Sequence, residues 1–183
     1  MSRFSKKAIV SAGLIFLSAA LLALSIAIPD RTCAAAVQAA PASCQAPEYH
    51  QFDFWLGDWE VQNPSGKMVG HNLVTRELDG CLIVEHWNDA ANKNLGSSFN
   101  YFDTRDKKWH QLYISNSGNA GDFPAMAGEF HDGKMQLTTD SHDGPVSRWT
   151  WYVVSPGHVR QMAEQIQPDK SWKITWDSIY VKK

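Results

Sequence analysis

Turn signals recur about every ten residues between Pro64 and Lys170, and this regular spacing limits the fold more than any other feature of the sequence. Nine turns rich in Gly, Pro, Asn and Asp separate about ten short segments of β-branched and aromatic residues, with no long helical stretch between them. Strands of this length and spacing are typical of an antiparallel sandwich or barrel. Because closure removes exposed strand edges, we predict an all-β, antiparallel barrel of about ten strands.

The first 36 residues have a different pattern, in which positive charge precedes a long apolar run. Three Lys and Arg residues among the first seven are followed by the uncharged segment 8–28 and by small residues at 34–36. This is the layout of a secretory signal peptide over residues 1–36. The apolar run of about 21 residues is close to the length of a membrane span, so an uncleaved anchor is the alternative.

The remainder of the chain is predicted to be a leader and one domain. Residues 37–46 are rich in Ala, Pro and Gln and lack periodicity, which predicts a flexible leader. Pro47 suits the first position of a short helix, placed over 47–56, and the barrel domain extends over 47–183.

The signal sequence and the charge together limit the compartment and the partners. We predict a periplasmic or secreted protein, or an inner-membrane-anchored one if the signal is not cleaved. After residue 36 the chain has 13 Lys and Arg against 18 Asp and Glu, a formal net charge of −5 with no basic stripe. We therefore expect no nucleic-acid partner and no stable membrane insertion after cleavage, while the oligomeric state stays open.

Cys44 and Cys81 are the two cysteines left after the predicted cleavage site. In an oxidising compartment two cysteines most simply pair with each other, and two separate buried thiols are the alternative. A disulfide would close a loop of about 37 residues, which the chain-entropy model values on the order of 3–4 kcal/mol.

The most specific string is the segment 52–61, FDFWLGDWEV, which contains Gly57-x-Trp59 where the predicted helix meets the first strand. It resembles the Gly-x-Trp signature of lipocalin-like (calycin) barrels, in which the Trp packs across the barrel base and a basic side chain from a late strand covers it. Arg148 and Arg160 are the candidates for that cation.

A longer pattern resembles a secreted bacterial family of unknown function with a lipocalin-like fold. The residues that carry this resemblance after Cys44 are Phe52 to Trp59, Asp79-Gly80-Cys81, Glu85-x-Trp87, Ser98-x-Asn100, Trp109-x-Gln111-x-Tyr113, Arg148-x-Thr150-Trp151 and Val159-Arg160-Gln161 with Glu164. The resemblance implies a lipocalin-like barrel and a Cys44–Cys81 bond, and it implies no particular reaction.

Nineteen aromatic residues follow residue 36, and these large rings either fill the barrel or line a cavity in it. Strand alternation places polar residues among them, so that Glu85 shares a face with Trp87 and Gln111 shares one with Tyr113. If these faces point inward, five polar groups lie inside the barrel: Glu85, Asn100, Gln111, Arg148 and Glu164. They would form either a satisfied internal network or the polar part of a ligand cavity, unless the faces are reversed and the residues are solvated.

We predict an exported module that binds a small apolar or aromatic molecule. The predicted ligand-binding residues are Trp55, Glu85, Trp87, Asn100, Trp109, Gln111, Tyr113, Arg148 and Glu164. The alternatives are an enzyme that uses Glu85 or Glu164 as a general acid or base, and a filled barrel that acts only through its surface.

No two of the seven His residues have H-x-H or H-x-x-x-H spacing, so the sequence predicts no local metal site. A haem held through one axial His is the alternative cofactor. His86 and His110 alternate with the Trp-bearing positions and are expected to point outward, so we expect no cofactor.

Overall fold

The computed structural model describes residues 44–116, 125–139 and 145–183. The predicted signal peptide over 1–36 and the leader residues 37–43 lie outside these described residues, as do parts of the predicted turns at 116–118 and 143–145. None of the helices in the described ranges has the length and apolarity that a membrane-spanning helix requires.

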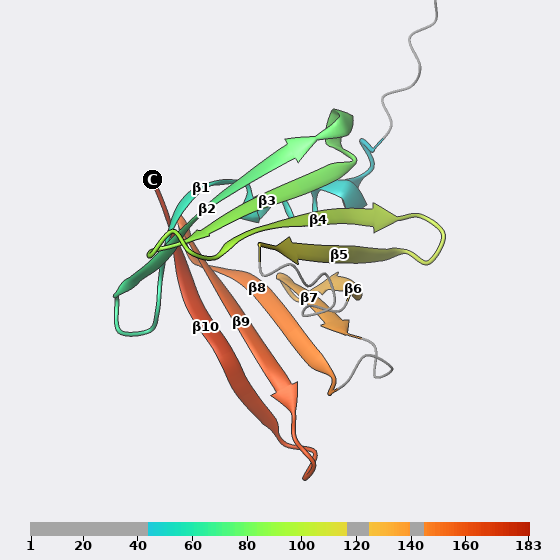
Figure 1. Cartoon of the computed structure of the whole chain (residues 1–183). Coiled ribbons are helices and arrows are strands. Elements are labelled where there is room, and N and C mark those ends of the chain that lie inside the picture. The colour runs from blue at the N-terminus through green and yellow to red at the C-terminus, as the bar shows by residue number, and fades with distance from the viewer. Residues whose placement is uncertain (1–43, 117–124, 140–144) are drawn as a thin grey trace, which may run out of the picture. The chain divides into compact units, whose positions relative to one another are not determined.

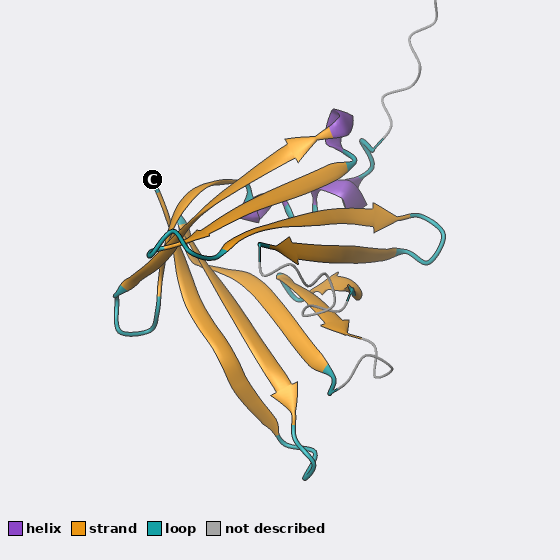
Figure 2. Cartoon of the chain, viewed as in Figure 1, coloured by secondary structure: helices purple, strands orange, loops and turns teal. Residues whose placement is uncertain are grey.

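The described residues form ten antiparallel strands that close into a barrel, which confirms the predicted fold class (Figure 1). The strands are β1 Gly57–Gln62, β2 Met68–Glu77, β3 Leu82–Asp89, β4 Leu95–Asp103, β5 Lys108–Ser115, β6 Met126–His131, β7 Lys134–Thr139, β8 Ser147–Ser155, β9 His158–Ile166 and β10 Trp172–Lys182. Each strand pairs with the next along the chain, and β1 pairs with β10 to close the barrel. Figure 2 shows how little of the described chain is helical.

Two short 3-10 helices, η1 Pro47–His50 and η2 Asp53–Trp55, precede the first strand, where the sequence predicts one short helix. The helix η1 packs against β4 and η2 packs against β8, and a third 3-10 turn, η3 Leu78–Gly80, joins β2 to β3. Gly57 allows the chain to turn from η2 into β1, because its φ of +146° lies in a region that residues with side chains rarely adopt.

A disulfide joins Cys44 to Cys81, as predicted, with the two Cα atoms 5.0 Å apart. It ties the segment before η1 to the residue that precedes β3. The two helices are therefore attached to the barrel at their N-terminal side by the disulfide and at their C-terminal side by β1.

Aromatic rings fill one end of the barrel. Phe52 is fully buried, stacks on Trp55 with ring centroids 4.9 Å apart, and meets the rings of Trp109 and Trp151 edge-on at 5.7 and 5.4 Å. We call this group the closed-end core; it also contains Trp59, Val61, Met135 and Leu137. Apolar burial on this scale is the main stabilising contribution in a domain of this size.

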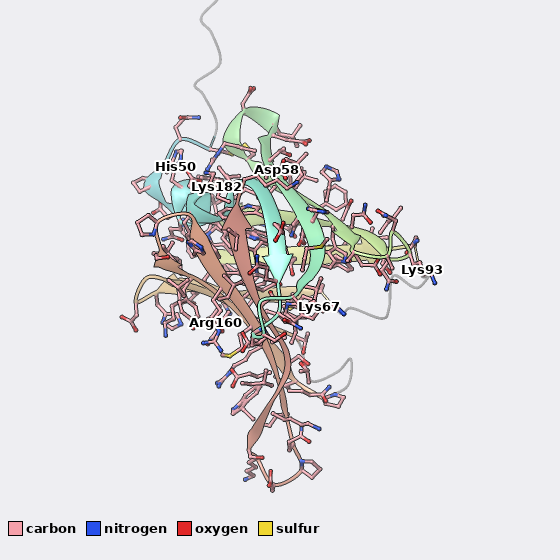
Figure 3. All side chains as sticks on the ribbon, turned by 90° about the vertical axis from the view of Figure 1, so that its left-hand side faces the viewer. His50, Asp58, Lys67, Lys93, Arg160 and Lys182 are labelled. Atoms are coloured by element: carbon pink, nitrogen blue, oxygen red, sulfur yellow. A yellow bond between two sulfur atoms is a disulfide. The ribbon has the colours of Figure 1, made fainter. Side chains whose placement is uncertain are left out.

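The cation over Trp59 comes from Lys182 in the last strand, whose Nζ lies 5.6 Å from the ring centroid. The predicted candidates Arg148 and Arg160 were wrong, because both lie on outer faces of their strands, where each pairs with an acidic side chain. Figure 3 labels Lys182 and Arg160 at their separate places on the barrel. A basic side chain from a late strand therefore covers Trp59, as expected, but this side chain is Lys182 and not one of the two Arg residues.

The barrel is least regular between β5 and β6. The two strands pair only at Trp109, His110 and Gln111 of β5, so the end of β5 that contains Tyr113 extends beyond the described part of β6.

Candidate functional site

A partly enclosed cavity of about 540 Å³ lies inside the barrel beyond the closed-end core. The described residues that line it are Val69, Glu85, Trp87, Asp89, Asn94, Gln111, Tyr113, Met126, Thr139, Ser147, Trp149, Gln161, Gln165, Thr175, Trp176 and Tyr180. Its volume falls within the range of about 300–1,000 Å³ that is usual for small-molecule sites. The barrel is therefore filled at one end and hollow at the other.

The cavity has an aromatic wall formed by half-buried rings from different strands. Trp87 on β3 and Trp176 on β10 meet edge-on, with ring centroids 6.0 Å apart and planes at 88°. Tyr113 lies across the backbone of β4, where Gly96 makes room for it, since a Cβ at this position would overlap the phenol ring. Trp149 completes the wall and stacks on Trp151 of the closed-end core at 6.1 Å.

Glu85 lies at the boundary between the cavity and the closed-end core, with only 5% of its surface exposed. Its Oε1 accepts a hydrogen bond of 2.6 Å from the Asn72 amide, and its Oε2 accepts one of 2.7 Å from the Ser98 hydroxyl. Ser98 in turn accepts from Asn100 at 2.9 Å, and Asn100 accepts from Gln111 at 2.7 Å. The chain of donors from β5 through β4 thus ends on the carboxyl group of β3.

A second set of hydrogen bonds connects the same layer to β9 and β10. Gln161 Oε1 accepts from the Tyr180 hydroxyl and from the Trp176 indole N–H, each at 2.9 Å. Asn72 links the two sets, because its Nδ2 also donates to the Tyr180 hydroxyl oxygen at 3.2 Å. We call the residues Asn72, Glu85, Ser98, Asn100, Gln111, Gln161 and Tyr180 the polar layer.

Burial dominates the titration of the polar layer. Desolvation raises the pKa of Glu85, and the hydrogen bonds from Ser98 and Asn72 lower it only in part. Desolvation, with a smaller contribution from the Glu85 charge, raises the pKa of Tyr113 to about 12 and that of Tyr180 well above its ordinary value. Both phenols are therefore neutral hydrogen-bonding groups throughout the physiological pH range.

The structure brings together five of the nine predicted ligand-binding residues. Glu85, Trp87, Gln111 and Tyr113 line the cavity, and Asn100 lies directly behind them in the polar layer. Trp55 and Trp109 point inward but belong to the closed-end core, where Trp55 is completely buried and the Trp109 indole donates to Gln51. These two rings pack in the closed-end core next to the cavity and do not line it.

Arg148 and Glu164 do not lie inside the barrel, contrary to the expectation. Arg148 alternates along β8 with Trp149, whose ring lines the cavity, so Arg148 is on the outer face. There its Nε binds Glu164 at 2.7 Å, and its guanidinium lies 4.1 Å from the centroid of the Trp172 ring. An acid–base pair of Glu85 and Glu164 across the cavity is therefore excluded by the geometry.

Sequence reasoning missed most other residues of the site, among them Asn72, Trp149, Gln161 and Trp176. Trp149 shares a strand face with Trp151, and Trp176 shares one with Tyr180. This even spacing of aromatic residues could have identified both Trp residues from the sequence. Asn72 and Gln161 are polar residues flanked on the inner faces of their strands by small or apolar residues such as Gly70, Val159 and Ala163, and no sequence signal distinguishes them from solvated positions.

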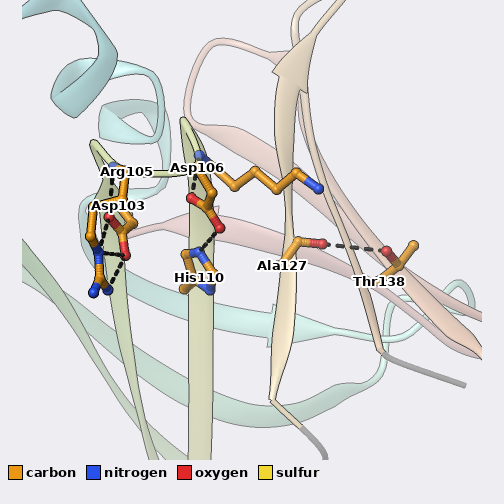
Figure 4. Close-up of polar contacts among 7 residues, drawn as sticks. Asp103, Arg105, Asp106, His110, Ala127 and Thr138 are labelled. Carbon is orange, nitrogen blue, oxygen red and sulfur yellow. Dashed lines mark hydrogen bonds and ion pairs between the residues drawn. The ribbon is translucent and has the colours of Figure 1, made fainter. Parts of the chain in front are cut away.

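One group outside the barrel has the residue types of a metal site. Potential ligand atoms of Asp103, Asp106 and His110 lie within 4.8 Å of one another at the β4–β5 turn (Figure 4). However, Arg105 binds both carboxylate oxygens of Asp103 and holds its pKa at about 2, while His110 pairs with Asp106 at 2.9 Å. The Asp103 carboxylate is thus already balanced by the Arg105 guanidinium, and the Asp106 carboxylate already has a hydrogen-bond partner in His110.

His86 and His110 point outward from their strands, as predicted. His86 is exposed and contacts Ser97 at 3.2 Å, and the ring of His110 stacks on Tyr101 at 5.2 Å. No His lines the cavity among the described residues. These residues offer no axial ligand to a haem inside the barrel.

Comparisons with known proteins add no family to this geometry. A scan against models of protein families finds no match to the chain, and a search among curated proteins finds no significant match. The resemblance to secreted lipocalin-like proteins stays a prediction, and function has to be argued from the site itself.

Proposed function

We propose that this barrel binds a small, largely apolar or aromatic molecule in its cavity. The observation that carries the proposal is the cavity of about 540 Å³, in which Trp87, Tyr113, Trp149 and Trp176 form the wall next to a buried polar layer. Apolar surface gives affinity in such sites, and a few fixed polar groups orient the ligand.

We also propose that the protein acts in the periplasm or outside the cell and belongs with the secreted lipocalin-like proteins that its motifs resemble. The Cys44–Cys81 disulfide supports an oxidising compartment, and the sequence pattern of residues 1–36 supports export. Mass spectrometry of the protein recovered from its host after expression of the full chain tests this. Removal of about 36 residues supports the proposal, and an intact N-terminus in the cytoplasmic fraction contradicts it.

Binding can be tested with the neutral fluorescent probe N-phenyl-1-naphthylamine, which emits strongly only in apolar surroundings. We expect saturable probe fluorescence together with quenching of the protein's Trp emission, because the wall rings would contact the probe. Loss of Trp149 in the variant Trp149→Ala should weaken probe binding about tenfold, since a wall ring contributes on the order of 1–2 kcal/mol to such contacts.

The matched control is Phe99→Ala. Phe99 is 39% exposed on the outer face of β4, beside an open surface groove, so it reports on binding outside the barrel. The proposal is contradicted if the probe does not bind, or if Phe99→Ala weakens binding while Trp149→Ala leaves it unchanged.

A further inference from the structure

The charge of the cavity lining is one-sided. Among the described residues that line it, Glu85 and Asp89 are acidic and none is Lys, Arg or His. The two internal segments outside the described ranges, 117–124 and 140–144, contain no Lys or Arg in their sequence. An anionic ligand such as a fatty acid would therefore meet negative groups without a compensating cation.

Glu85 is a buried carboxyl group without a cationic partner in the described structure. Its two hydrogen-bond donors, Asn72 and Ser98, are neutral, and no described ion pair includes it. Asn72 Oδ1, in the same layer, is a buried acceptor for which no described donor is present. A buried charge without a counter-charge is unfavourable, so a ligand that supplies positive charge or hydrogen-bond donors would relieve this imbalance.

The aromatic wall lies next to this carboxyl group. Trp87 is two residues from Glu85 on the same inner face of β3, and Trp176 meets Trp87 edge-on at 6.0 Å. Tyr113 lines the cavity from β5, opposite Ser98 in the register of β4. Rings around an acidic group form the environment that proteins use for ammonium and quaternary ammonium groups, because the ring faces carry partial negative charge.

We propose that the ligand of this barrel is a small organic cation, with an ammonium or quaternary ammonium group on an apolar or aromatic body. The cationic group lies against Glu85 between the rings of Trp87, Trp176 and Tyr113. The apolar body extends along Trp149 toward the mouth, by which we mean the end of the cavity opposite the closed-end core. Asp89 at the mouth, which the backbone N–H of Lys93 holds ionised by lowering its pKa, attracts the cation electrostatically. This inference rests on the proposed function and names its ligand class.

Three probes of similar size separate charge from shape. Benzyltrimethylammonium is a permanent cation, neopentylbenzene is its uncharged isostere, and phenylacetate is an anion. Each displaces N-phenyl-1-naphthylamine if it occupies the cavity. We expect the cation to displace the neutral probe at concentrations at least about tenfold lower than either of the other two, in line with the strength of close charge pairs and cation–π contacts.

The variant Glu85→Gln keeps the size and the acceptor for Asn72 but removes the charge. It should abolish the advantage of the cation over its isostere, with both displacements measured against this variant's own affinity for N-phenyl-1-naphthylamine. Glu164→Gln is the matched control, because it removes the same charge from the outer face of β9. It should leave all three probes unchanged.

A pH profile of the unmodified protein keeps the test independent of the variants. The other titratable groups in the described cavity lining are Tyr113 and Tyr180, both neutral, and Asp89, whose lowered pKa keeps it ionised where Glu85 titrates. The side chains that β2 and β4 present to Glu85 are the uncharged Asn72 and Ser98, and β9 adds the uncharged Gln161 to the same layer. A proton competes with the cation for Glu85, whose pKa is raised, so affinity for benzyltrimethylammonium should increase with pH through the titration of this group. Affinity for the uncharged isostere should stay constant.

The outcomes distinguish the two proposals. If neopentylbenzene or phenylacetate displaces N-phenyl-1-naphthylamine as well as the cation does, or none of the three displaces it, the cation proposal is overturned and the binding barrel stands. If Glu85→Gln retains the advantage of the cation, or its affinity does not change with pH, the assignment to Glu85 is overturned. If N-phenyl-1-naphthylamine itself does not bind, both proposals fail.

Discussion

The closed-end core and the cavity are built from the same strands and the same inner faces, yet one is packed solid and the other is hollow. On β8, Trp151 is completely buried in the core, while Trp149, two residues away on the same face, lines the cavity. On β5, Trp109 likewise belongs to the closed-end core, while Tyr113 lines the cavity. Aromatic residues at alternate positions therefore do not determine by themselves whether a barrel is filled.

Two features outside the strand pattern create the difference. At the closed end, Phe52, which directly precedes η2, and Trp55 of η2 are buried in the barrel core, and their rings pack on one another at 4.9 Å. At the other end no described helix enters the barrel, and β5 extends beyond its pairing with β6. The polar layer around Glu85 lies between the two regions. Its side chains need hydrogen-bond partners, so the apolar packing of the closed-end core stops there. The filled end thus depends on the segment before β1, and the hollow end lies where β5 extends beyond its described pairing with β6.

The sharpest comparison is between Trp151→Ala and Trp149→Ala. We expect Trp151→Ala to lower the free energy of unfolding by about 3–5 kcal/mol, because it leaves a large void in a fully packed region. Trp149→Ala should lower it by roughly 1–2 kcal/mol, since its ring already borders empty space. Urea unfolding followed by far-UV circular dichroism measures both. Equal losses of stability for the two variants would mean that the regions are packed alike.

The disulfide tests whether the closed end depends on its helical segment. The double variant Cys44→Ser with Cys81→Ser should lower the free energy of unfolding by about 3–4 kcal/mol, because the unfolded chain regains the freedom of a 37-residue separation. Below the unfolding transition, the folded fraction should bind N-phenyl-1-naphthylamine as the wild type does. A loss of probe binding without a loss of stability would show that the bond shapes the cavity instead of the core.

The fold was predictable because two local signals agree along the whole domain. Turn residues every ten or so positions and β-branched or aromatic segments between them leave few arrangements other than an antiparallel barrel. The helix before Gly57 and the pairing of Cys44 with Cys81 were also predicted correctly. The sequence missed the division into a filled and a hollow end, because that division depends on how far each strand extends beside its neighbour.

The site was predictable only where one face of a strand is clearly more apolar than the other. On β3 and β5, Trp87 and Tyr113 identify the inner face, so Glu85 and Gln111 were placed correctly. On β8 the pattern is ambiguous, since Trp149 and Tyr152 lie on opposite faces and Arg148 alternates with the inward ring. A shift of one residue reverses every side chain of a strand, which explains the misplacement of Arg148.

Glu85 provides a smaller effect that separates the polar layer from the core. Its pKa is raised in the folded state, so the folded protein binds this proton more tightly than the unfolded chain does. The contribution of Glu85 to the free energy of unfolding is most favourable when the pH is below the unfolded pKa of about 4.5, and it is lost as the pH rises through the folded pKa. Glu85→Gln does not titrate, and we expect its stability to match that of the wild type at low pH.

Above that range the variant should become the more stable of the two proteins. The difference in the free energy of unfolding between the two proteins should reach about 1.4 kcal/mol for each unit by which the folded pKa of Glu85 exceeds its unfolded pKa. Thermal unfolding between pH 4 and pH 8 measures it, with Glu164→Gln as a control that removes a carboxyl group from the outer face and retains Glu85. A wild type that gains stability relative to Glu85→Gln as the pH rises would show that the carboxylate is paired in the folded protein.

The smallest expected effect concerns the outer face. Arg148 and Glu164 form an ion pair of 2.7 Å in which the side chains are 30% and 13% exposed. Because partly exposed pairs are screened by solvent, Glu164→Gln should lower the free energy of unfolding by only about 0.5–1 kcal/mol, and 1 M salt should reduce the difference further. Urea unfolding at low and high salt measures it, and Arg148→Met combined with Glu164→Gln isolates the coupling from the stacking of Arg148 on Trp172. A loss comparable to that of Trp151→Ala would show instead that this pair stabilises the barrel as the closed-end core does.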